Sequence, residues 1–128
     1  MLRVAAVAVV ENGRLLLVSK TAAPEVFYLP GGKPEPGESP EDCVRRELLE
    51  ELGVGLASLE FDHTIHASAA LEGVPMAMDV FRGELTGEPA AAAEIAAIAW
   101  HRPGEPFAGT LAPAIRALYA SAPVWMRS

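Results

Sequence analysis

The stretch that decides the fold is GGKPEPGESPEDCVRRELLEELGV, residues 31–54. Residues 30–38 hold three prolines and three glycines, which excludes a regular helix or central strand and predicts a structured loop. A helix is predicted over residues 40–52, because Ser39 is a good N-cap and Pro40 suits the first helical position. Gly53 follows as a typical C-terminal glycine. The sequence therefore places a glycine-rich loop directly before a helix with defined ends.

One face of this predicted helix is acidic. At about 100° per residue, Glu47, Glu50 and Glu51 fall within one sector of the helix. An adjacent apolar stripe predicts packing on a core, and it consists of Val44, Leu48 and Leu52. Carboxylates three and four residues apart repel one another, whereas a hard divalent cation requires converging carboxylates. A solvated acidic face is the alternative interpretation, and the helix alone leaves it open.

The residues around the acidic face complete a longer pattern. It reads G-x5-E-x7-R-E-U-x-E-E-x-G-U, where U is bulky and apolar, and it is filled by Gly32, Glu38, Arg46, Glu47, Leu48, Glu50, Glu51, Gly53 and Val54. The chain thereby resembles the Nudix hydrolase family at every fixed position of its signature. Residues 29–33, LPGGK, also resemble the run before the helix in MutT-type members. Glu94-Ile95 followed by Trp100 is similar to the family's late acidic loop and the strand after it.

The resemblance implies a fold and an activity. The expected fold is α/β (α+β), a Nudix-like α/β/α sandwich with a mixed β-sheet between helices, formed by residues 1–128 as a single domain. The expected activity is metal-dependent hydrolysis of a pyrophosphate bond in a small, nucleoside-diphosphate-linked substrate. The alternative is a module that binds a nucleotide or metabolite without cleaving it, because fold alone does not give function. We favour the enzyme, since a module that only binds has no need for three repelling glutamates.

The resemblance also implies a metal site. Glu47, Glu50 and Glu51 are expected to ligate Mg²⁺ or Mn²⁺, and the backbone carbonyl of Gly31 or Gly32 can add a further oxygen. Mg²⁺ takes a few oxygens from protein and keeps the rest for water and substrate phosphate. The metal would offset charge on the phosphoryl oxygens and lower the pKa of a bound water.

Catalytic roles are expected for Arg46, Glu47, Glu50 and Glu94. Glu47 is the first candidate for the general base that helps a water attack phosphorus, and Glu94 is the second. Arg46 lies one helical turn before Glu50 and is expected to orient that carboxylate through a charge-assisted hydrogen bond.

Three further residues are candidates for substrate contacts. Lys33 could reach a phosphate, although a solvated loop lysine is the alternative. Glu38 lies at the junction of loop and helix, near the same helix end. Tyr28 could line a base pocket together with Phe27, Met76 and Met78, or all four could belong to the core.

The rest of the chain predicts strands and a second helix. Strands are expected over residues 2–10, 14–19, 26–29, 59–67, 75–85 and 95–100, and a C-terminal helix over residues 110–120. Asn12-Gly13 predicts a tight hairpin turn between the first two strands. Cys43 is expected to be a small packed residue, and His101 is expected at the surface.

The composition of the chain limits which classes of binding partner and which cellular locations are expected. With 128 residues and 51% apolar content, the chain fits one globular domain. Its net charge of −7 disfavours a nucleic-acid polymer, which needs a basic patch, but not a small phosphorylated ligand. Apolar runs are too short to span a membrane, no signal-peptide layout is evident, and one cysteine excludes an internal disulfide, so a cytoplasmic location is expected. Assembly as a homodimer is left open.

Overall fold

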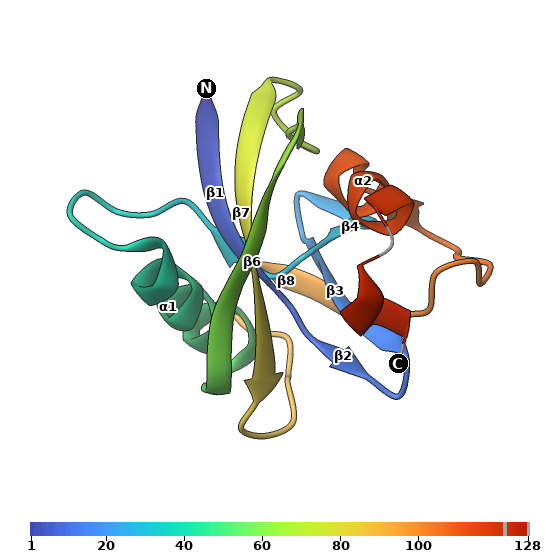
Figure 1. The fold of residues 1–128 in the computed structure, drawn as a ribbon, viewed down its shortest axis with the longest axis horizontal. Helices are drawn as coiled ribbons and strands as arrows, with labels where there is room; N and C mark the ends of the chain where they lie inside the picture. Colours follow the sequence, from blue (N-terminus) through green and yellow to red (C-terminus); the bar gives the residue numbers. More distant parts are fainter. Residues whose placement is uncertain (122, 128) are drawn as a thin grey trace.

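The computed structural model describes residues 1–121 and 123–127 and forms a mixed α+β fold (Figure 1). Its elements, in chain order, are β1 (Leu2–Ala8), β2 (Val10–Glu11), β3 (Arg14–Lys20), β4 (Ala23–Tyr28), β5 (Gly31–Gly32), α1 (Pro40–Leu52), β6 (Leu56–Ser68), β7 (Pro75–Leu85), β8 (Ile95–His101), β9 (Thr110–Leu111), α2 (Pro113–Ser121) and the 3₁₀-helix η1 (Val124–Arg127). None of the described helices is long and apolar enough to cross a bilayer.

The strands form two mixed sheets between the helices. The four-stranded sheet has the order β5-β1-β7-β6, in which β1 and β7 are parallel and the other pairs are antiparallel. The five-stranded sheet has the order β2-β3-β4-β9, with β8 paired to β3. In Figure 1, α1 lies on one side of the β1–β7–β6 sheet and α2 lies on the other. The expected layered fold with mixed pairing is confirmed, with the strands divided between two sheets.

Strand β1 supplies core residues to both faces of its sheet. Ala5 and Val7 belong to the apolar cluster with α1, whereas Ala6 and Ala8 belong to the cluster with α2. Alternate side chains of a strand point to opposite faces, so a strand covered on both sides is apolar throughout. The helical partners in these clusters are Cys43, Val44, Leu48 and Leu52 of α1 and Ala114, Ile115 and Leu118 of α2. The predicted packing of Cys43 in the core is confirmed.

Local signals set the ends of α1 as predicted. The Ser39 hydroxyl accepts a hydrogen bond from the Asp42 backbone N–H at 3.1 Å. At the other end Gly53 adopts φ 66°, and its N–H donates to the Leu49 carbonyl. Asn12 and Gly13 both have positive φ, 53° and 75°, as the turn between β2 and β3 requires.

Three expectations are corrected by long-range contacts. The second helix begins at Pro113 instead of residue 110, because Thr110–Leu111 pairs with β4 as strand β9. Gly31–Gly32, expected within a loop, pairs with β1. His101 is 4% exposed instead of lying at the surface, because its ring bonds the Tyr119 hydroxyl and the Glu105 carbonyl.

Candidate active site

Two glycines allow strand β5 to lie close against both β1 and α1. Gly31 adopts φ 151°, and a Cβ atom there would overlap the backbone of Ala5. A Cβ atom on Gly32 would lie 2.6 Å from the carboxyl carbon of Glu47. The Cys43 thiol approaches the Gly32 carbonyl at 3.4 Å from the helix side. The glycine pair therefore determines how closely the acidic face of α1 meets the sheet.

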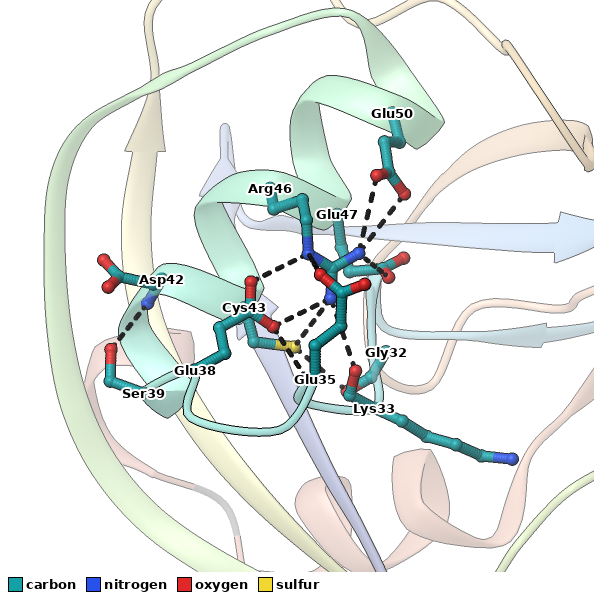
Figure 2. Close-up of polar contacts among 10 residues, drawn as sticks. All are labelled: Gly32, Lys33, Glu35, Glu38, Ser39, Asp42, Cys43, Arg46, Glu47 and Glu50. Carbon is teal, nitrogen blue, oxygen red and sulfur yellow. Dashed lines mark hydrogen bonds and ion pairs between the residues drawn. The ribbon is translucent and has the colours of Figure 1, made fainter.

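Arg46 is the centre of an ion-pair network on this face (Figure 2). Its Nε and Nη2 atoms donate to both carboxylate oxygens of Glu38, at 2.8 and 2.9 Å. Nη1 donates to Glu47 at 2.8 Å and to Glu50 at 3.4 Å. The guanidinium also lies 3.2 Å from Glu35. The expected contact with Glu50 is present, but the shorter bonds orient Glu38 and Glu47.

Glu38 is held in place as an ion by this network. The hydrogen bonds from Arg46, followed by the one from the Glu35 backbone N–H, lower the pKa of Glu38 to about 2. Both Glu38 oxygens are thus engaged within the loop and with α1. These contacts fix the loop over residues 33–38 against the helix.

The surroundings of Glu51 disfavour its charged form, whereas those of Glu38 favour it. Its side chain is 6% exposed, and Oε1 accepts a hydrogen bond from the Gly31 N–H at 3.2 Å. Burial, and then the negative charge of Glu47, raise the pKa of Glu51 to about 8. A nearby cation would favour the ionised form of such a carboxyl group.

The acidic face offers oxygen donors without forming a ready-made metal cluster. Within residues 1–121 and 123–127, no group of three or more histidine, cysteine, aspartate or glutamate side chains is gathered closely enough to hold a metal ion. Arg46 occupies the position between Glu47 and Glu50. The donor set still fits Mg²⁺ or Mn²⁺, because carboxylates are hard ligands and the crowded charges of Glu47 and Glu51 would be offset. Ligation by Glu47, Glu50, Glu51 and the carbonyls of Gly31 and Gly32 stays a prediction.

A cavity of about 350 Å³ adjoins this cluster. Glu47, Gly31 and Gly32 line it, together with Lys33, so the acidic face and the cavity share residues. Its apolar part includes Val4, Leu29, Met76 and Met78. A larger hollow of about 810 Å³ lies between the ends of β6 and β7 and the Asn12-Gly13 turn, but none of the predicted site residues lines it. The smaller cavity is therefore the candidate substrate site.

Tyr28 also lines the cavity, as expected for a substrate-binding residue. Its hydroxyl is buried without a hydrogen-bond partner among the described residues. Burial, and then the charge of Glu51, raise the pKa of Tyr28 above its ordinary value, so the hydroxyl stays protonated. It can therefore donate a hydrogen bond to a ligand in the cavity.

Within the described residues, the side chain of Glu94 forms no hydrogen bond or ion pair that fixes its role. The loop before it docks on the end of α1, where the N–H groups of Ala90 and Ala92 donate to the carbonyls of Leu52 and Glu51. The Glu94 side chain is exposed. The loop thus approaches the helix as predicted, and the catalytic role of Glu94 stays a prediction.

Three charged residues of the site were not predicted from the sequence. Lys20 and Glu72 line the cavity, and Glu35 contacts Arg46. Lys20 ends β3 and Glu72 lies in the turn between β6 and β7, so only the tertiary fold brings them together. A motif confined to residues 32–54 carries no signal for either of them.

The chain is similar to known proteins in both sequence and fold. The NUDIX domain pattern matches residues 1–122. A Bacillus subtilis protein provisionally named an 8-oxo-dGTP diphosphatase is 35% identical over 99 residues, which cover 73% of this chain and 61% of the relative. A Mycobacterium tuberculosis protein with a similar provisional name is 32% identical over 100 residues, covering 76% and 70% of the two chains. The crystal structure of a MutT NUDIX hydrolase from Burkholderia pseudomallei is 28% identical, with a TM-score of 0.80 and coverage of 94% and 97%.

The fold and site thus define a small α+β protein in which a glycine-supported acidic helix adjoins a cavity. The chain belongs to the NUDIX family. The predicted resemblance to MutT-like members of the Nudix hydrolase family is confirmed.

Proposed function

We propose that this protein is a metal-dependent pyrophosphohydrolase that cleaves a small nucleoside-diphosphate-linked substrate. One observation carries the proposal: Glu47 belongs to the acidic face of α1 and also lines the cavity. A substrate in the cavity would therefore present its phosphates to the carboxylates. Substrate and catalytic groups held in such proximity account for a large share of enzymatic rate enhancement.

The proposed roles divide the acidic face between metal and proton transfer. Glu47, Glu50 and Glu51 would hold Mg²⁺ or Mn²⁺ with a carbonyl of Gly31 or Gly32, and the ion would stabilise charge on the phosphoryl oxygens. Arg46 positions the Glu47 carboxylate through its 2.8 Å bond. Glu47 is our first choice of general base. Glu94, on the loop docked against the helix end, is the second.

The cavity favours one nucleoside over a larger ligand. Its volume of about 350 Å³ lies at the lower end of the range for small-molecule sites. The thioethers of Met76 and Met78 suit an aromatic base, and the Tyr28 hydroxyl can bond a polar atom of that base. Lys33 would contact phosphate, and Glu38 would fix the loop that carries it. The names of the relatives make an oxidised purine nucleoside triphosphate the first candidate substrate.

A nucleotide-binding module without catalysis is the second candidate. The observation that favours it is Arg46, which neutralises Glu47 and Glu50 and lies where a metal ion would compete with it. For the enzyme, Mg²⁺ must draw these carboxylates away from the guanidinium. For the binding module, the ion pairs persist with ligand present.

A substrate panel separates the two functions. Oxidised nucleoside triphosphates, nucleotide sugars and dinucleotides are incubated with the wild type in Mg²⁺, in Mn²⁺ and in excess chelator, and the nucleotide products are separated and measured by chromatography. The enzyme predicts turnover of at least one compound that stops with chelator. Tight binding without metal-dependent cleavage across the panel would replace the enzyme with the binding module.

A further inference from the structure

An ion pair joins two segments at the rim of the cavity. Lys33 Nζ lies 3.5 Å from Glu72 Oε2, and both side chains line the cavity that Glu47 also lines. Lys33 follows the glycine pair of β5, whereas Glu72 lies in the turn between β6 and β7. Figure 2 shows the Lys33 side chain extending away from the carboxylates around Arg46. Lys33, which the sequence suggests as a phosphate contact, thus already forms an ion pair with Glu72.

A second lysine in the cavity provides a contrast. Lys20 Nζ lies 6.0 Å from the ring centroid of Tyr28, and no carboxylate within the described part of the chain forms a salt bridge with it. The cavity therefore holds one lysine paired with an acid and one that is not. The two lysines differ because Glu72 forms an ion pair with Lys33 and not with Lys20.

If a phosphate and the Glu72 carboxylate both contacted the Lys33 ammonium group, the two negative charges would repel each other. A phosphate oxygen bonded to Nζ would lie within about 6 Å of the Glu72 carboxylate, a distance at which like charges still repel appreciably near a protein surface. The ion pair is solvent-accessible, with exposed side-chain fractions of 62% and 45%, so it can open. Exposed ion pairs of this kind are weak.

We propose that Glu72 is a positioning residue that competes with substrate phosphate for Lys33 and thereby limits the affinity of the cavity for phosphorylated ligands. This inference rests on the proposed function, because it assumes that the cavity takes a nucleotide. Glu72 acts through Lys33 and contacts no reacting atom. It keeps the binding of phosphorylated products weak and so favours their release.

Binding without turnover tests the proposal. The dissociation constants of dGMP and deoxyguanosine are measured by calorimetry at low ionic strength in chelator, for the wild type and Glu72→Gln. The variant is expected to bind dGMP about two- to fivefold more tightly, the size expected for a weak exposed ion pair, and deoxyguanosine unchanged. High salt should reduce the gain, because it screens exposed charges. Glu60→Gln, an equal charge change at an exposed residue outside this cavity, is the matched control and should change neither constant.

A double-mutant cycle shows whether Glu72 acts through Lys33. In a Lys33→Gln background, Glu72→Gln should give no gain in dGMP affinity. On a substrate found by the panel, Glu72→Gln should lower KM. The proposal is overturned if Glu72→Gln leaves dGMP binding unchanged or weakens it, or if the gain persists without Lys33. A wild type that binds dGMP but cleaves no nucleotide overturns catalysis and leaves this inference standing.

Discussion

Replacing Glu51 with glutamine tests the buried carboxyl group of α1. Glu51 is 6% exposed, and the charges that face it come from Glu47, Glu50 and Lys20. Burial and the repulsion from Glu47 raise the pKa of Glu51 from 4.5 to about 8. The glutamine side chain has nearly the same shape and carries no charge, so it removes the ionisation and keeps the packing. Its carbonyl oxygen can still accept the Gly31 N–H.

The raised pKa makes the metal-free protein less stable as pH rises. Between pH 4.5 and about 8 the folded state binds more protons than the unfolded state, so the free energy of unfolding falls with pH. At about 1.4 kcal/mol per pH unit, the loss at pH 8 is on the order of 4 kcal/mol. Glu51→Gln abolishes this loss. At pH 8 the variant should therefore melt higher than the wild type by more than about 10 °C, whereas at pH 4.5 the two should be close.

Thermal unfolding in excess chelator at pH 4.5, 6 and 8 provides the assay. Glu50→Gln is the matched control, since it removes a carboxylate from the same helix at a side chain that is 55% exposed. Its melting temperature should stay close to that of the wild type at all three pH values. Equal pH dependence in the wild type and Glu51→Gln would refute the buried, perturbed carboxyl. So would a Glu51→Gln protein that melts lower than the wild type at pH 8.

Further predictions concern the metal, the base and the glycines. Glu50→Gln should reduce kcat by at least ~10²-fold, because a metal ligand supplies several kcal/mol of transition-state stabilisation, and near wild-type turnover would refute the metal assignment. Glu94→Gln should lower kcat with substrate affinity within a few-fold if Glu94 is the base, whereas an unchanged kcat would exclude that role. Gly32→Ala should displace only the flexible end of Glu47, so steady-state assays should show lost activity while unfolding stability changes by less than about 1 kcal/mol. Gly31→Ala must instead strain the backbone beside Ala5 and should lower the melting temperature strongly; equal melting of the two alanine variants would contradict this distinction.

The sequence predicts α1 well because its determinants are local. Ser39, Pro40 and Gly53 lie within one segment, and the helix occupies the predicted residues. The Asn12-Gly13 turn is confirmed for the same reason. By contrast, strand β9 and the burial of His101 depend on β4 and on Tyr119, which are distant in sequence. No local pattern carries such pairings.

In the candidate site, too, features set by local sequence were predicted, and features that depend on distant segments were not. The signature identifies the acidic side chains of α1 and the glycines that support them, since all lie within residues 31–54. It does not reveal that Arg46 bonds Glu38 and Glu47 more closely than Glu50, because that depends on how the loop folds back. The cavity is less predictable still. Its charged rim combines Lys20, Lys33 and Glu72 from three separate elements.

Glu47 links the acidic helix to the cavity, and the proposed metal-dependent hydrolysis depends on this link. The rate of substrate cleavage is compared between the wild type and Glu47→Gln across a range of Mg²⁺ concentrations, on the best substrate of the panel. Wild-type turnover should rise with Mg²⁺ and stop in chelator, and Glu47→Gln should be slower by at least ~10²-fold at saturating Mg²⁺. Full wild-type activity in excess chelator, or near wild-type turnover by Glu47→Gln, would contradict the proposed function.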